Sequence, residues 1–255
     1  MNRVVKQHGF TLIELTLAMG FVAVLLIAIA MTVIQIGDIY NRGITLKDVN
    51  QAGRSITSEL QRSIAGTTPF DADPGAGSHY ISMKTKSTIL TSYIKQDPVG
   101  GRLCLGQYSY IWNYGKALDD AAKMHDNSSL NAYASPNNGL QIRFVKVSDP
   151  GATYCADASK EIVFSDATEL LDVGQHDLVI HNFKISTADS AFDATTEQRL
   201  YSIEFLLGTN NQSALTTDPD TEVIICRPPS DPLADPSYCS VVQFDIVARA
   251  GNAAK

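Results

Sequence analysis

The segment Gly9-Phe10-Thr11-Leu12-Ile13-Glu14, together with the apolar run that follows it, decides the fold of this 255-residue chain. A short leader with the cations Arg3 and Lys6 precedes it, and twenty consecutive residues from Leu15 to Ile34 carry no charge. A run of this length can cross a bilayer as a helix. A carboxylate at the centre of a membrane helix costs about 2.5–3.5 kcal/mol, and somewhat less near its end. We therefore expect Glu14 to have a functional role and a partner.

Two other interpretations compete for this apolar run. An ordinary secretory signal peptide would be cut after small residues beyond the run, and the nearest such site, Ala28-Ile29-Ala30, lies inside it. A plain single-span anchor fits the length of the run but gives Glu14 no role. In either case the basic leader is expected to stay in the cytoplasm and the rest of the chain to be exported, by the positive-inside rule.

The residues from Lys6 to Ala30 resemble the N-terminal segment of type IV pilins and of the pseudopilins of type II secretion. The resemblance implies that a membrane-embedded prepilin peptidase cuts between Gly9 and Phe10, and that the new Phe10 amine is N-methylated. It also implies that Glu14 pairs with the Phe10 amine of a neighbouring subunit during assembly. Such a pair suits a low dielectric, where each charge needs the other. Glu14 could also complement the dipole at the helix N-terminus.

An apolar stripe at helical spacing predicts that the helix continues past the membrane. The stripe consists of Ile39, Leu46, Val49, Ala52, Ile56, Leu60 and Ile64. Gly66, followed by Thr67, Thr68 and Pro69, is expected to end the helix. The chain then divides into a leader at residues 1–9, a transmembrane and assembly helix at 10–36, an amphipathic continuation at 37–65 and an exported β-rich domain at 66–255.

Alternation of apolar and polar residues predicts strands throughout the exported domain. We expect strands at residues 103–114, 140–147, 161–164, 178–185, 200–207, 222–226 and 241–248, and a short helix at 117–125. In the last strand Val242, Phe244, Ile246 and Ala248 share one face. The predicted fold class is therefore α+β: a long N-terminal helix packed on an antiparallel sheet, as in pilins.

The charge and the motifs of the chain restrict its function. The net charge is −7, and loss of the two cations in the leader would make it −9. An acidic body argues against bulk binding of nucleic acid, which depends on neutralising phosphates. The sequence contains no zinc-protease, nucleophile-elbow, phosphate-loop or dinucleotide motif, and these are the patterns that would indicate an enzyme. We therefore expect no enzymatic activity and no cofactor.

The four cysteines all lie in the exported domain, where an even number indicates disulfides. Three pairings are possible. We favour Cys226 with Cys239, which closes a loop of twelve residues worth about 3 kcal/mol of stability; Cys104 then pairs with Cys155. The proline-rich loop from 226 to 239 loosely resembles the disulfide-bounded C-terminal loop of pilins, which often faces partners in that family. Stapling of two strands is the simpler interpretation.

Two further clusters are candidates for ligand binding. The alternating aromatic residues could form a stacking surface for sugars or single-stranded DNA, although packing in the core is the favoured interpretation; they are Tyr108, Tyr110, Trp112 and Tyr114. The alternating acids Asp218, Asp220 and Glu222 could hold calcium through their oxygens. A solvated turn before a strand explains these acids more simply, so we expect no metal centre.

Together with the resemblance, these features predict a minor pilin of a type IV pilus, placed in the initiation or tip complex. Its expected partners are other pilin subunits, contacted through the N-terminal helix, as well as prepilin peptidase and the pilus assembly platform. It would rest in the cytoplasmic membrane as a single-pass protein and then enter an extracellular pilus. A minor pseudopilin of type II secretion shares every N-terminal feature. A pilus-borne adhesin or DNA-binding subunit would use the aromatic residues as its surface.

Overall fold

The computed structural model describes residues 11–73, 79–84, 88–90, 93–95, 98–119, 143–157, 167–171, 177–193 and 198–251. The leader and the expected cleavage site at Gly9 and Phe10 lie outside these ranges. So do the expected strand at 161–164 and the part of the expected short helix that follows residue 119.

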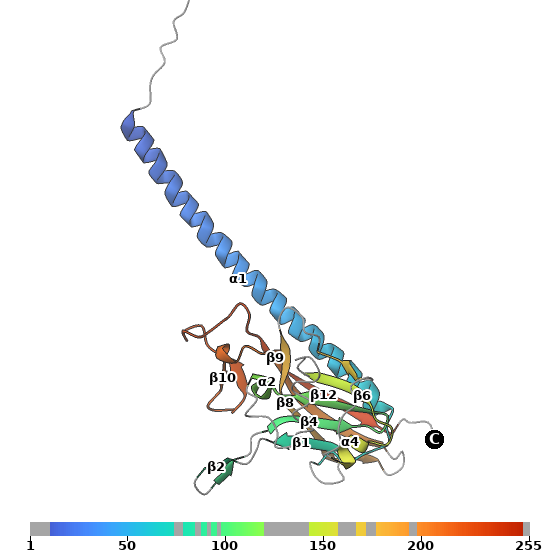
Figure 1. The fold of residues 1–255 in the computed structure, drawn as a ribbon. Helices are drawn as coiled ribbons and strands as arrows, with labels where there is room; N and C mark the ends of the chain where they lie inside the picture. Colours follow the sequence, from blue (N-terminus) through green and yellow to red (C-terminus); the bar gives the residue numbers. More distant parts are fainter. Residues whose placement is uncertain are drawn as a thin grey trace, which may run out of the picture.

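The longest element is α1 (Leu12–Ala65), an unbroken helix of 54 residues whose first half extends away from the body (Figure 1). At 1.5 Å per residue it is about 80 Å long. Its C-terminus is closed locally, because the Gly66 N–H donates to the Arg62 carbonyl at 3.3 Å and the Thr67 hydroxyl donates to the Ile64 carbonyl at 2.8 Å. Pro69 follows, and proline has no N–H with which to continue a helix.

The body consists mainly of two antiparallel sheets and two short hairpins. The larger sheet has the order β1-β4-β5-β6-β7, and the smaller has the order β12-β9-β8. The strands of the larger sheet are β1 (Tyr80–Lys84), β4 (Pro98–Cys104), β5 (Tyr108–Asn113), β6 (Phe144–Ser148) and β7 (Ala167–Glu169). Those of the smaller sheet are β8 (Leu178–Asp193), β9 (Gln198–Thr209) and β12 (Val241–Ala250).

The remaining elements are short and lie between these strands. The two hairpins are β2 (Thr88–Leu90) with β3 (Tyr93–Lys95), and β10 (Leu215–Thr217) with β11 (Ile224–Cys226). The short helices are α2 (Gly115–Asp119), α4 (Thr153–Ala156) and the 3-10 turn η3 (Gln212–Ala214).

The main core lies between the second half of α1 and the two sheets. Val49, Ile56, Leu60 and Ile64 of α1 belong to the same buried cluster as the aromatic residues of both sheets. Trp112 of β5 meets Phe183 of β8 with ring centroids 4.3 Å apart, and this contact joins the two sheets. Phe205 stacks on Phe244 in the sheet that α1 covers. The predicted α+β class, a long helix packed on antiparallel strands, is confirmed.

Two sequence predictions need correction. The run 103–114 is not one strand, because Gly106 adopts a φ of 86° and reverses the chain between β4 and β5. The buried stripe of α1 begins at Thr45 and Val49, and not at Ile39, which is 73% exposed. Leu46 is also exposed. The spacing identified the correct face of the helix, but the body covers only the last part of that face.

Candidate membrane and assembly surface

The first half of α1 presents an uncovered apolar surface. Its large apolar side chains from Leu12 to Tyr40 are all exposed, between 45% for Leu25 and 81% for Leu12. By length and composition this segment is able to cross a membrane, and its most apolar stretch is not buried against the body. Burying such a surface in lipid or against other helices is strongly favourable, because each apolar Å² removed from water contributes about 25 cal/mol.

Glu14 forms a capping box with Thr11 at the start of this helix. The Thr11 N–H donates to Glu14 Oε2 at 2.9 Å, the Thr11 hydroxyl donates to the same oxygen at 2.8 Å, and the Glu14 N–H donates back to Thr11 Oγ1 at 3.4 Å. Two of these bonds satisfy backbone N–H groups that the start of the helix leaves unpaired. The carboxylate is thus held beside the Thr11 N–H, at the positive end of the helix dipole.

Both disulfides have the pairing that the sequence favoured. Cys104 at the end of β4 bonds Cys155 of α4, and Cys226 of β11 bonds Cys239 just before β12. We call residues 226–239 the disulfide loop. Inside it the Arg227 guanidinium pairs with the Asp231 carboxylate at 2.9 Å, and the Asp235 carboxylate accepts the Tyr238 N–H at 3.2 Å. These bonds fix parts of the loop against one another.

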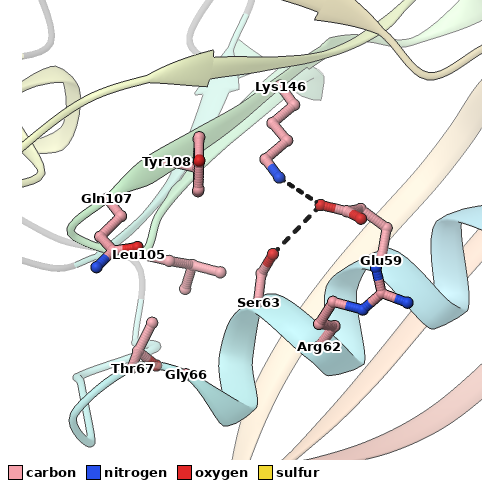
Figure 2. A pocket seen from close by; sticks show the side chains of 9 residues that line it. All are labelled: Glu59, Arg62, Ser63, Gly66, Thr67, Leu105, Gln107, Tyr108 and Lys146. Carbon is pink, nitrogen blue, oxygen red and sulfur yellow. Dashed lines mark hydrogen bonds and ion pairs between the residues drawn. The ribbon is translucent and has the colours of Figure 1, made fainter. Parts of the chain in front are cut away.

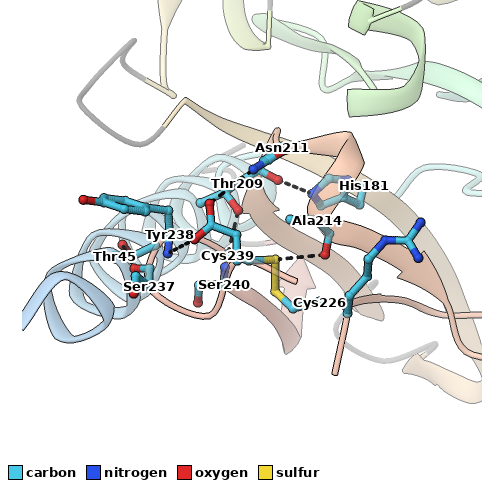
Figure 3. Close-up of a disulfide and its surroundings, with 12 residues drawn as sticks. Thr45, His181, Thr209, Asn211, Ala214, Cys226, Ser237, Tyr238, Cys239 and Ser240 are labelled. Carbon is cyan, nitrogen blue, oxygen red and sulfur yellow. Dashed lines mark hydrogen bonds between the residues drawn. A yellow bond between two sulfur atoms is a disulfide. The ribbon is translucent and has the colours of Figure 1, made fainter. Parts of the chain in front are cut away.

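The disulfide loop binds α1 where the helix leaves the body, as Figure 3 shows. The Thr45 hydroxyl donates to the Ser237 carbonyl at 3.2 Å, and the Asn41 amide donates to the Tyr238 hydroxyl at 2.9 Å. The Ser237 hydroxyl donates to Asp38 at 3.4 Å. Thr45 is fully buried by this contact. The apolar stripe alone does not predict these polar contacts, although Asn41 and Thr45 have the spacing of one helix face.

A second polar junction holds the far end of α1 to the larger sheet. Lys146 of β6 bonds the Glu59 carboxylate at 2.6 Å and lies 3.8 Å from the ring centroid of Tyr108. Tyr110 donates to the same carboxylate oxygen at 2.9 Å. The Lys146 bond is the main cause of a lowered pKa at Glu59, and burial raises the pKa of Tyr110.

This junction borders an open hollow of about 240 Å³, drawn in Figure 2. The residues that line it are Glu59, Arg62, Ser63, Gly66, Thr67, Leu105, Gln107, Tyr108 and Lys146. The carboxylate of Glu59 is bonded to both Lys146 and Tyr110. These bonds hold α1 on the larger sheet beside the hollow.

Three of the four alternating aromatic residues at 108–114 pack in the core, which is the interpretation that the sequence favoured. Tyr110 is 0%, Trp112 1% and Tyr114 4% exposed, while Tyr108 alone reaches 41%. The aromatic face of β5 packs in the main core with residues of α1 and the smaller sheet, and a second buried cluster around Ile111 covers the other face. Alternation in sequence therefore does not mean that one face of the strand is exposed.

The acids at 218, 220 and 222 form a turn. Asp218 accepts the backbone N–H groups of Asp220 at 2.9 Å and Thr221 at 3.1 Å, and these bonds lower its pKa. Within the ranges that the structure describes, no group of three or more histidine, cysteine or acidic side chains is arranged to hold a metal ion. Asp218 therefore serves the turn between β10 and β11 with one of its oxygens.

Comparison with models of known families, with curated proteins and with solved structures gives no match to this chain. Its class therefore rests on architecture. An exposed apolar N-terminal helix that continues, without a break, into a half packed on antiparallel sheets is a pilin-like arrangement.

Proposed function

We propose that this chain is a minor pilin, a structural subunit without enzymatic activity. Prepilin peptidase would cut it between Gly9 and Phe10, and the mature protein would enter the initiation or tip complex of a type IV pilus. The observation that carries the proposal is the division of α1 into two halves. The half up to Tyr40 is apolar and uncovered, and the half from Thr45 is fixed to the body.

The division suits a protein that exchanges one apolar environment for another. Before assembly, lipid of the cytoplasmic membrane would cover the first half of α1, with the body outside. On extraction by the assembly platform, the helices of other pilin subunits would replace the lipid. Lipid is as apolar as those helices, so close packing and polar pairs must supply the specificity. The pair between Glu14 and the Phe10 amine of a neighbour is the polar contact that we propose.

The other candidate functions have less support. Burial of Trp112 counts against the stacking surface of an adhesin or a DNA-binding subunit. A secretion pseudopilin would use the same helix in the same way, and the body offers no feature that favours it. The size of the body favours a minor subunit over the main one, because a thin filament is built most easily from small bodies.

The test is the copy number of the protein in sheared, purified filaments. Quantitative mass spectrometry should include the peptide that begins at Phe10. We expect a few copies per filament, with a methylated Phe10 amine. A dominant signal would make the chain the main subunit. Absence from filaments, with processing still seen in membranes, would overturn the pilus assignment and favour a secretion pseudopilin.

A further inference from the structure

Of the parts of the body that Figure 1 shows in colour, the disulfide loop reaches farthest along α1 toward its apolar half. It bonds α1 at Asp38, Asn41 and Thr45. The apolar segment ends at Ile36, so these contacts fall two to nine residues further along the helix. At 1.5 Å per residue, the loop is held about 3–14 Å beyond the end of that segment. If α1 spans a bilayer, the nearer of these contacts fall within the headgroup region, which is about 5–8 Å thick on each side.

The disulfide loop exposes apolar and aromatic side chains. Leu233 is 57% and Tyr238 50% exposed, and Tyr40 of α1 is 67% exposed. The prolines of the loop are exposed as well; they are Pro228, Pro229, Pro232 and Pro236. The charged side chains of the loop have partners within the loop, since Arg227 pairs with Asp231 and Asp235 accepts the Tyr238 N–H.

This surface has the chemistry of a membrane interface. Tyrosine is enriched where a membrane meets water, because its ring is apolar and its hydroxyl is polar. Exposed apolar residues grouped on one surface commonly mark an interaction site. The loop also meets α1 directly beyond its apolar segment, since its first contact is with Asp38. A disulfide and four prolines limit the freedom of the loop, so little conformational entropy would be lost when it docks.

We propose that the disulfide loop is a membrane-docking surface. In the membrane-anchored state Leu233 and Tyr238, with Tyr40 of α1, lie among the phospholipid headgroups of the outer leaflet. This inference rests on the membrane-anchored state that the proposed function requires. The loop then fixes the body against the bilayer at one side of α1, and it must leave the lipid when the subunit is extracted.

Tryptophan fluorescence in the full chain tests the proposal. The native Trp112 is only 1% exposed, so the wild-type protein gives a baseline that lipid quenchers do not reach. The reporter is Leu233→Trp. Its matched control is Val247→Trp, because Val247 is 61% exposed and its carbonyl accepts the Gln61 amide, near the opposite end of α1. A third variant, Leu25→Trp, reports on insertion of the helix itself.

Each variant is reconstituted in vesicles of phosphatidylethanolamine and phosphatidylglycerol whose acyl chains carry bromine close to the headgroup. Because Leu25 lies near the middle of the apolar run, Leu25→Trp is measured in vesicles whose acyl chains carry bromine near their ends. We expect the Leu233→Trp reporter to lose most of its emission, and the Val247→Trp control to keep it. Quenching of Leu25→Trp without quenching of Leu233→Trp would overturn the docking surface and leave the anchor intact. A lack of quenching at both positions would overturn the membrane-anchored state as well.

The test also separates lipid from a second copy of the chain as the occupant of the loop. A second copy would shift the emission of the Leu233→Trp variant to shorter wavelength as the ratio of protein to lipid rises, without quenching by bromine. That outcome would overturn the proposal. Quenching that is independent of the protein-to-lipid ratio is the result expected for lipid.

Discussion

The two halves of α1 share one continuous helical backbone but have opposite surroundings. In the first half no large apolar side chain up to Tyr40 is less than 45% exposed, whereas Val49, Ile56, Leu60 and Ile64 in the second half are at most 1% exposed. The first half is apolar on every side and the second has a single apolar stripe. One helix can therefore contain two successive patterns, an all-round apolar segment and an amphipathic segment. The residue at which the pattern changes marks where the body begins to cover the helix.

The largest effect is expected at Glu14, in the first half. Glu14→Leu should leave membrane insertion intact, because the apolar segment becomes longer, and should lower incorporation into filaments roughly tenfold or more, because a neighbour's Phe10 amine would lose its partner in a low dielectric. Incorporation is measured by quantitative mass spectrometry of sheared filaments, and insertion by fractionation of membranes.

Thr11→Ala is the matched control for the capping role of Glu14. It removes the hydroxyl from the capping box, while the carboxylate and the Thr11 N–H bond to it remain available. Normal incorporation of Thr11→Ala beside defective Glu14→Leu would assign the defect to the charge. Equal defects in both would mean that Glu14 acts only by starting the helix, and normal incorporation of both would exclude the assembly role.

The second prediction compares one leucine from each half. Leu60 is 0% exposed and Leu26 is 60% exposed. Leu60→Ala should destabilise the body by about 2–5 kcal/mol, through lost burial and a residual cavity, whereas Leu26→Ala should change the unfolding of the body by less than about 0.5 kcal/mol. Thermal unfolding of the detergent-solubilised chain, followed by near-ultraviolet circular dichroism, measures both. Similar losses would mean that the first half also packs on the body.

The same contrast explains which features could be predicted from the sequence. The helix, the α+β class and both disulfide pairs depend on local patterns or on loop closure, and they agree with the structure. The exposure of Ile39 and Leu46 could not be predicted, because helical spacing gives a face and not the point where the body ends. That point is set by the position of β12 and of the disulfide loop along α1.

The site residues show a second limit. Alternation places Tyr108, Tyr110 and Trp112 on one face of β5, but only the packing of α1 and of the smaller sheet reveals that this face is covered. The contacts of Thr45 and Asn41 with Ser237 and Tyr238 join residues 192 and 197 positions apart. Neither the helix sequence nor the loop sequence carries a local signal for such a contact, because single polar residues are common on helices and in loops.

The third prediction concerns two glycines of α1, one on each side of the boundary. A Cβ on Gly43 would meet nothing within 4 Å, whereas a Cβ on Gly53 would overlap the ring of Phe244. Gly43→Ala should therefore stabilise by up to about 1 kcal/mol through helix propensity, and Gly53→Ala should destabilise by about 1–3 kcal/mol through overpacking. The stacking of Phe244 on Phe205 limits its escape. Chemical denaturation measures both, and stabilisation by Gly53→Ala would contradict close packing of α1 on β12.

The smallest effect is expected at Glu59, in the ion pair that fixes the second half of α1. Because Lys146 lowers the pKa of Glu59 below its ordinary value of 4.5, the carboxylate stabilises the fold above that value, and the contribution is lost as the pH falls through the lowered pKa. The pair is partly exposed, so Glu59→Gln should cost less than about 1 kcal/mol at pH 7. Chemical denaturation of the wild type and of Glu59→Gln, from pH 7 down through the lowered pKa of Glu59, should show the difference in unfolding free energy vanish in acid.

A double-mutant cycle with Lys146→Gln supplies the control, since without the ammonium the same change at Glu59 should show a weaker pH dependence. A cost that persists unchanged in acid would mean that the Glu59 side chain holds the helix by its shape, and not by its charge.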